Sequence, residues 1–99
     1  MKVLAHNPSG WFLVQDGRRL LFDVNCSHSA FGFSRVFELS EGERTDYGKR
    51  GSAFLDDLAE KVQYHAMDLF AIRHLGADIE RAVTEAVSAW RASGGEVNG

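Results

Sequence analysis

The sequence predicts an α+β fold, in which an N-terminal antiparallel sheet of about four strands precedes two to three C-terminal helices packed on one sheet face. Two observations lead to this class. Up to residue 39, apolar residues form short β-prone runs or alternate with polar ones, whereas from Ser40 onward they recur at helical spacing. A block of strands followed by a block of helices is typical of α+β domains. We expect one domain over residues 1–92 and a flexible tail over residues 93–99.

The segment WFLVQDGRRLLFDV predicts a β-hairpin, the clearest element of the sheet. Asp16 and Gly17 stand between two β-prone runs, and both residues tolerate the positive φ angles of a two-residue type I′ turn. This turn decides which residues share a face of the hairpin. One face holds Trp11, Leu13, Leu20 and Phe22, and the other holds Phe12, Val14 and Leu21. A turn over residues 7–10, with proline second and glycine fourth, joins an earlier strand over residues 2–6.

Residues 30–39 predict a fourth strand, because large apolar and smaller or polar side chains alternate along them. One face of this strand holds Phe31, Phe33, Phe37 and Leu39, and the other holds Gly32, Ser34, Val36 and Glu38. The phenylalanine face is expected to pack against the helices, since their apolar stripes need a partner surface.

The remainder of the chain predicts helices. Ser40 and Glu43 have the spacing of a capping box and start a short helix that ends near Tyr47. Ser52 is expected to cap a firmer helix over residues 53–66. Residues 67–75 are ambiguous, and a second helix that ends at Gly76 is one interpretation. A last helix over residues 78–91 has an apolar stripe formed by Ile79, Val83, Ala86, Val87 and Trp90.

Charge and composition limit the function classes. The net charge is −3, divided as +1 over residues 1–50 and −4 over residues 51–99. A mildly acidic helical half disfavours a dedicated nucleic-acid binder, whose phosphate contacts need clustered Lys and Arg. A single cysteine cannot form an internal disulfide, and no stretch is long and apolar enough to span a membrane. We therefore expect a cytoplasmic protein that does not bind membranes.

The stretch VNCSHSAFGF, residues 24–33, holds the one cysteine of the chain and is a candidate active-site loop. A nucleophilic Cys26 would need a base in contact with its sulfur, but His28 lies two residues along a strand, about 6.5 Å away between Cα atoms. The favoured interpretation is a structural loop with a half-buried thiol. The four histidines and the cysteine have no zinc-ligand spacing, so neither a metal nor a cofactor is expected.

Gly48-Lys49-Arg50-Gly51 resembles the GxxG loop of KH domains, in which small residues let a nucleic-acid backbone approach closely. The resemblance covers these four residues and the helices around them. It implies a nucleic-acid site formed by Arg44, Gly48, Lys49, Arg50 and Gly51. The favoured alternative is a turn that ends one helix and starts the next.

Both faces of the predicted hairpin are apolar, although one sheet face of a two-layer domain should be wet. The outer face predicts a partner-binding surface formed by Phe12, Val14, Leu21 and Val36. The competing interpretation is internal cover, by the N-terminal strand or by residues 67–75.

The sequence therefore favours a small protein-binding module without catalytic activity. It would be a homodimer or an immunity-type antagonist of a basic enzyme. The antagonist is supported only by the size and the charge of the chain. The alternatives are a weak nucleic-acid binder that uses Gly48–Gly51 and, more remotely, an enzyme that uses Cys26.

Overall fold

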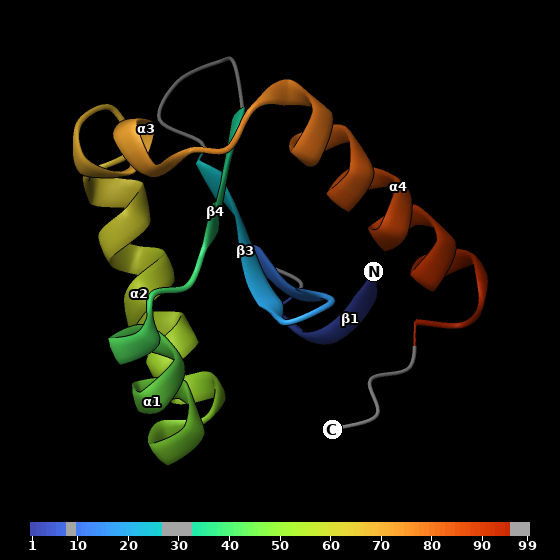
Figure 1. The fold of residues 1–99 in the computed structure, drawn as a ribbon, viewed down its shortest axis with the longest axis horizontal. Coiled ribbons are helices and arrows are strands. Elements are labelled where there is room, and N and C mark those ends of the chain that lie inside the picture. Colours follow the sequence, from blue (N-terminus) through green and yellow to red (C-terminus); the bar gives the residue numbers. More distant parts are fainter. Residues whose placement is uncertain (8–9, 27–32, 96–99) are drawn as a thin grey trace.

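A computed structural model describes residues 1–7, 10–26 and 33–95. Figure 1 shows one sheet between two helical layers, with α1, α2 and α3 on one side and α4 on the other. The strands are β1 (Lys2–Asn7), β2 (Trp11–Asp16), β3 (Arg19–Cys26) and β4 (Phe33–Glu38). The helices are α1 (Glu41–Arg50), α2 (Ser52–Tyr64), α3 (Leu69–Arg73) and α4 (Ala77–Ala92). The strands form an antiparallel meander in the order β1-β2-β3-β4, which confirms the predicted fold class.

The β2–β3 hairpin turns one residue later than predicted. Asp16 pairs with Arg19, so the two turn residues are Gly17 and Arg18 rather than Asp16 and Gly17. Gly17 has a φ of 61°, and no non-glycine residue that the structure describes has a positive φ. A glycine at the first turn position alone is the pattern of a type II′ turn, not of the predicted type I′. Moving the turn by one residue shifts the pairing of the strands by two residues. Because side chains alternate between the two faces of a strand, a shift of two leaves every residue on its predicted face.

The first hydrophobic core lies between the sheet and the layer of α1, α2 and α3. It contains one face of β2 and β3, and α2 closes it with Leu55, Leu58, Ala59 and Val62. The predicted phenylalanine face points into it: the Phe37 ring meets the Phe22 ring edge-on at 5.9 Å and the Phe70 ring at 5.1 Å. Phe31 of that predicted face lies outside the described residues.

A second hydrophobic core lies on the opposite face of the sheet, which differs from the prediction that all helices pack on one face. The buried residues of this second core are Val3, Val14, Leu21, Val36, Val83 and Val87. The apolar stripe of α4 therefore covers the face that sequence reasoning left open. The domain is a three-layer arrangement, with the sheet as its middle layer.

The helix ends match the prediction in part. Ser40 forms the predicted capping box, because its hydroxyl accepts from the backbone N–H of Glu43 while the Glu43 carboxylate accepts from Ser40 N. α1 continues beyond Tyr47 to Arg50. Ser52 is not a cap: Gly51, at a φ of 64°, joins α1 directly to α2. None of the helices formed by the described residues is long and apolar enough to cross a bilayer.

The segment between α2 and α4 covers the outer edge of β4. Leu75 N donates to Val36 O at 2.8 Å, and Val36 N donates to Nδ1 of His74 at 3.0 Å. Farther along the same strand, Arg35 Nε donates to Ala66 O at 2.8 Å. The two contacts of Val36 satisfy backbone edge groups that would otherwise be open to strand pairing, and the Arg35 contact is made by a side chain. They also hold the ambiguous residues 67–75 in place as a turn, the short helix α3 and an extended connection.

Arg73 fixes α3 to the rest of the domain. Its guanidinium donates two hydrogen bonds to the Glu43 carboxylate, at 2.6 and 2.9 Å, and one to Glu38 O at 2.9 Å. The same group lies 4.4 Å from the centre of the Phe37 ring. Burial raises the pKa of Glu43, but hydrogen bonds from Arg73 and Ser40 outweigh it, so the carboxyl titrates below its usual range. Arg73 therefore connects α3, α1 and β4.

We expect Arg73→Lys to lower the free energy of unfolding by about 2 kcal/mol, because lysine keeps the charge but cannot form the two-pronged contact with Glu43. Chemical denaturation followed by circular dichroism measures the change. Arg81→Lys, on the exposed side of α4, is the matched control and should be near neutral. Equal stability of the two variants would contradict the connecting role of Arg73.

Candidate protein-binding surface

The surface predicted to bind a partner is covered in this structure. Val14, Leu21 and Val36 are fully buried beneath α4, and only Phe12 of the four predicted residues remains half-buried. The Phe12 ring packs edge-on against Trp90 at 5.8 Å, and the Arg91 guanidinium lies 5.1 Å from its centre. The prediction is thus corrected: within one chain this face is core, because the last helix crosses to it.

The predicted GxxG loop is not a loop in the structure. Gly48, Lys49 and Arg50 belong to the last turn of α1, and Gly51 alone forms the junction with α2. Two of the nearby cations have protein partners: Arg50 pairs with Asp57, and Arg44 donates to the carbonyl of Arg18. A phosphate-binding loop with free backbone amides is therefore absent at this position, and the interpretation as a helix-to-helix junction is the one that fits.

Cys26 is fully buried at the end of β3, where its thiol contacts the carbonyl of Val24. Burial raises the pKa of the Cys26 thiol despite the opposing charge of Arg35. A protonated, buried thiol is a poor nucleophile. Residues 27–32, which complete the predicted loop and include His28, lie outside the described residues.

A polar cluster that sequence reasoning missed lies under the first turns of α4. Asp23 projects from β3 toward α4, and Ser34 of β4 hydrogen-bonds to it. Burial, reinforced by the charge of Glu80, raises the pKa of Asp23 from 3.8 to about 6. His74 accepts from Val36 N through Nδ1, so its N–H is on Nε2, which lies 3.5 Å from a Glu80 oxygen.

This cluster does not form a metal centre. Among the residues that the structure describes, no group of three or more His, Cys, Asp or Glu side chains is placed to hold a metal ion. The side chains of the cluster contact one another or the backbone: Ser34 hydrogen-bonds to Asp23, and His74 lies between β4 and Glu80. Asp23 is thus a partly buried ionisable group between β3 and α4.

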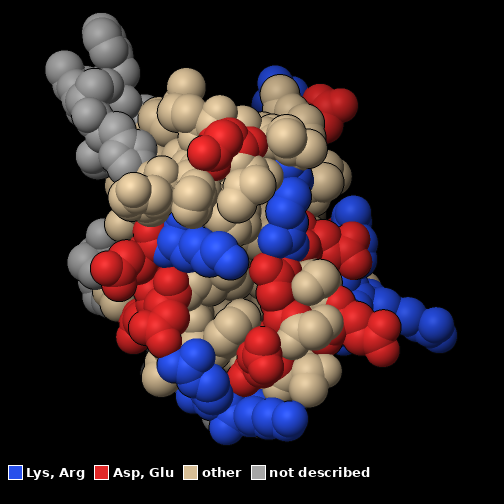
Figure 2. Space-filling model, turned by 90° about the vertical axis from the view of Figure 1, so that its left-hand side faces the viewer, with Lys and Arg blue, Asp and Glu red and all other residues tan. Residues whose placement is uncertain are grey.

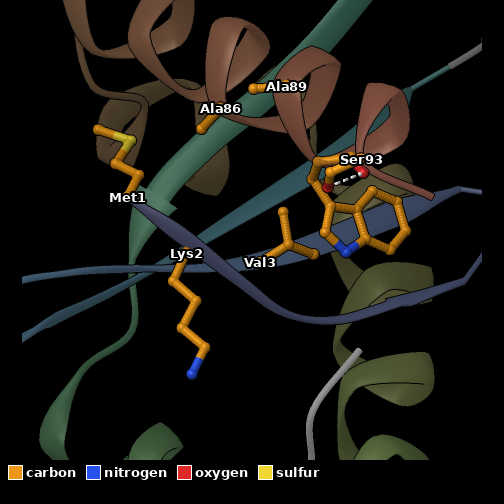
Figure 3. Close-up of a pocket in the computed structure, with 7 residues that line it drawn as sticks. Met1, Lys2, Val3, Ala86, Ala89 and Ser93 are labelled. Atoms are coloured by element: carbon orange, nitrogen blue, oxygen red, sulfur yellow. Dashed lines mark hydrogen bonds between the residues drawn. The ribbon is translucent and has the colours of Figure 1, made fainter. Parts of the chain in front are cut away.

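A groove between β1 and α4 is the second feature on that side of the sheet (Figure 3). Its volume is about 360 Å³, and the described residues that line it are Met1, Lys2, Val3, Ala86, Ala89, Trp90 and Ser93. The Lys2 side chain extends away from the groove, and the Ser93 hydroxyl donates to the Trp90 carbonyl. Small-molecule sites need polar groups that converge on the ligand. Neither Lys2 nor Ser93 points a polar group into the groove, so its lining does not indicate a ligand.

The α2–α3 corner has the opposite character, because large apolar side chains project from it into solvent. We use this name for four residues and their exposed fractions: Tyr64 (83%), Met67 (76%), Leu69 (51%) and Ile72 (86%). Met1 is the one other large apolar side chain exposed among the described residues. Isolated exposed apolar residues are ordinary, but four within a nine-residue segment form a patch.

Local structure explains why these side chains face outward. α3 is barely more than one turn, and within it Phe70 points into the first core. Leu69 and Ile72, three residues apart, lie on the same side of that turn, away from the core. Met67 lies beside Arg35, whose Nη2 is 3.9 Å from the methionine sulfur. The signal was present in the sequence MDLFAIRHL, since four consecutive nonpolar residues cannot all face one core from a short helix.

The rim of the corner contains charges of both signs. Asp57, Glu60 and Lys61 line a shallow depression together with Tyr64 and His65. Asp68 accepts from Leu69 N and lies 3.2 Å from Nδ1 of His65; the backbone hydrogen bond, aided by His65, lowers the pKa of the Asp68 carboxyl. Figure 2 shows this end of the molecule as mainly uncharged surface, with acidic and basic residues interspersed below it.

Comparisons with known proteins find no match: no family model, no curated protein and no solved structure matches this chain.

Proposed function

We propose that this chain is a small protein-binding module and that the α2–α3 corner is its binding surface. The observation that supports the proposal is the outward projection of four large apolar side chains from one corner. Each of the four is more than half exposed. The largest apolar patches on typical monomers are about 300–600 Å² and often have a function. Covering such a patch with a protein partner removes it from water.

The position of the corner also suits a binding surface. At Val36 the outer edge of β4 is paired with His74 and Leu75, so at this point a partner would meet side chains rather than an open strand edge. Arg73 anchors α3, which carries Leu69 and Ile72, through Glu43 and Glu38. A surface that is ordered before binding loses less conformational entropy when the partner docks.

Antagonism of a basic enzyme receives less support from the charges. Asp56 accepts hydrogen bonds from Trp11 and Asn7, and Asp57 pairs with Arg50. Two acidic side chains of α2 are therefore engaged within the chain, and a basic partner would compete with these contacts. We therefore favour recognition of an apolar surface over recognition of a basic one.

A photo-reactive amino acid placed at position 72 in cells that naturally produce the protein tests the proposal. Illumination should yield one defined covalent adduct, because Ile72 is the most exposed of the four apolar residues of the corner, at 86%. The matched control is the same amino acid at Ser88, which is exposed on α4 and far from the corner in the fold. No adduct at position 72, or the same adducts from both positions, would contradict the proposed surface.

A further inference from the structure

We infer that the partner of the α2–α3 corner is a second copy of this chain, related by a two-fold axis. This inference rests on the proposed function and names its partner. In a two-fold dimer the same patch meets itself, so a patch must be complementary to its own rotated copy in both shape and charge. The charges around the corner meet the second requirement.

The rim of the corner has two formal positive and two formal negative charges, which cancel. The cations are Lys61 and Arg35, and the anions are Glu60 and Asp68; Asp57 also lines the depression, but its charge is paired with Arg50. A two-fold rotation can place cations of one copy opposite anions of the other, and like charges need not meet. A different protein with a strongly acidic or strongly basic surface would be repelled by half of the charges in this rim. The balance of signs therefore favours a second copy.

The apolar patch needs its polar rim to reach the area of a dimer interface. Two facing patches of the size that typical monomers show, roughly 300–600 Å² each, would bury about 600–1,200 Å², so the rim must supply the remainder. Stable specific interfaces bury about 1,200–2,000 Å² in total, with an apolar centre and a polar border. The net charge of −3 per chain is small, so electrostatic repulsion between two copies opposes pairing only weakly.

Sedimentation equilibrium over a wide concentration range tests the inference. The native chain should sediment as a dimer, and Ile72→Glu should raise the dissociation constant about 10- to 100-fold, as expected when a charge replaces an apolar side chain in an interface. Ile72 is exposed in the single chain, so the variant should keep its fold and its circular dichroism spectrum. Ser88→Glu adds the same charge at an exposed position of α4 and should leave the dimer unchanged.

A mixing experiment tests the rim. Lys61→Glu gives each copy an acidic rim and Glu60→Lys gives each a basic one, so each variant alone should dimerise more weakly than the native chain. An equimolar mixture should restore a dimer that contains one copy of each. If the mixture gains no mass over the separate variants, or if each variant alone dimerises like the native chain, the rim charges do not meet across an interface, and the inference is wrong.

The outcomes separate this inference from the proposed function. The native chain could stay monomeric at all concentrations and still form an adduct with a different protein from position 72. That result would rule out a second copy as the partner, but the proposed binding surface would stand. A monomer with no adduct would overturn both. A dimer that persists in Ile72→Glu would show that two copies meet elsewhere, which also overturns the inference.

Discussion

Leu21→Glu is expected to unfold the domain rather than to release a folded monomer. Leu21 is fully buried between β3 and α4, together with Val14, Val36 and Val83. Truncating a buried leucine costs about 2–5 kcal/mol, and a carboxylate buried there without a partner costs several more. The total approaches the whole stability of a small domain, about 5–15 kcal/mol. Circular dichroism at room temperature should show loss of helix and sheet signals.

Gln15→Glu is the matched control, because it adds the same charge at an exposed position of the same hairpin. It should unfold at nearly the same denaturant concentration as the native chain. A Leu21→Glu variant that stays folded, with intact circular dichroism and a monomeric mass, would mean that α4 does not cover this face in solution. The originally predicted partner surface would then be restored.

Asp23→Asn is expected to stabilise the domain above neutral pH. The pKa of Asp23 is 3.8 in a free chain and about 6 in the folded domain, where burial and Glu80 disfavour its charge. Between these values the folded chain holds a proton that the unfolded chain has released, so stability from this group falls as pH rises. The loss is complete above pH 6 and corresponds to about 3 kcal/mol. Asparagine removes the buried charge and hence the loss.

The measurement compares unfolding free energies of the variant and the native chain across pH. Their difference should be small near pH 4, where Asp23 is protonated in the folded domain, and should grow to its full size above pH 6. Asp46→Asn, at an exposed position of α1, is the control and should change stability little. A difference that does not increase with pH would mean that Asp23 is not an unfavourable buried charge.

The sequence determined the sheet well, for an identifiable reason. Strand periodicity assigns side chains to faces, and an error of one residue in the turn moves the pairing by two, which leaves the faces unchanged. Trp11 and Leu13 are therefore in the predicted group, opposite Val14. The turn type was wrong because Asp16, although tolerant of a positive φ, pairs with Arg19 instead and forms an ion pair with it at 2.6 Å.

The position of α4 could not be read from the sequence. The stripe of Ile79, Val83 and Val87 shows which side of the helix is apolar, but not which face of the sheet receives it. That choice depends on the path of residues 74–76. Hydrogen bonds from Leu75 and to His74 hold this connection against the edge of β4, from where the chain passes to the far face. These contacts join residues almost forty positions apart, beyond the reach of local patterns.

The candidate site was misplaced for the same reason. Sequence reasoning correctly found an apolar surface in excess of what one helical layer could cover, but assigned it to Phe12, Val14, Leu21 and Val36. Once α4 covers that face, the excess remains at Tyr64, Met67, Leu69 and Ile72, because α3 is too short to turn all its apolar residues inward. The presence of surplus apolar surface was predictable from the sequence. Its position was not, because it depends on the face of the sheet to which the chain carries α4.

The residues of the two hydrophobic cores emerge from the ribosome at different times. The first core has its full set of buried residues once Phe70 has emerged, whereas the second also needs Val83 and Val87 of α4. During synthesis the sheet can therefore fold on α2 while its other face, with Val14, Leu21 and Val36, still lacks a cover. Exposed apolar sheet surface is what makes incomplete chains associate wrongly and what chaperones bind. The sheet therefore exposes its largest apolar surface in the interval before α4 has emerged and docked on it.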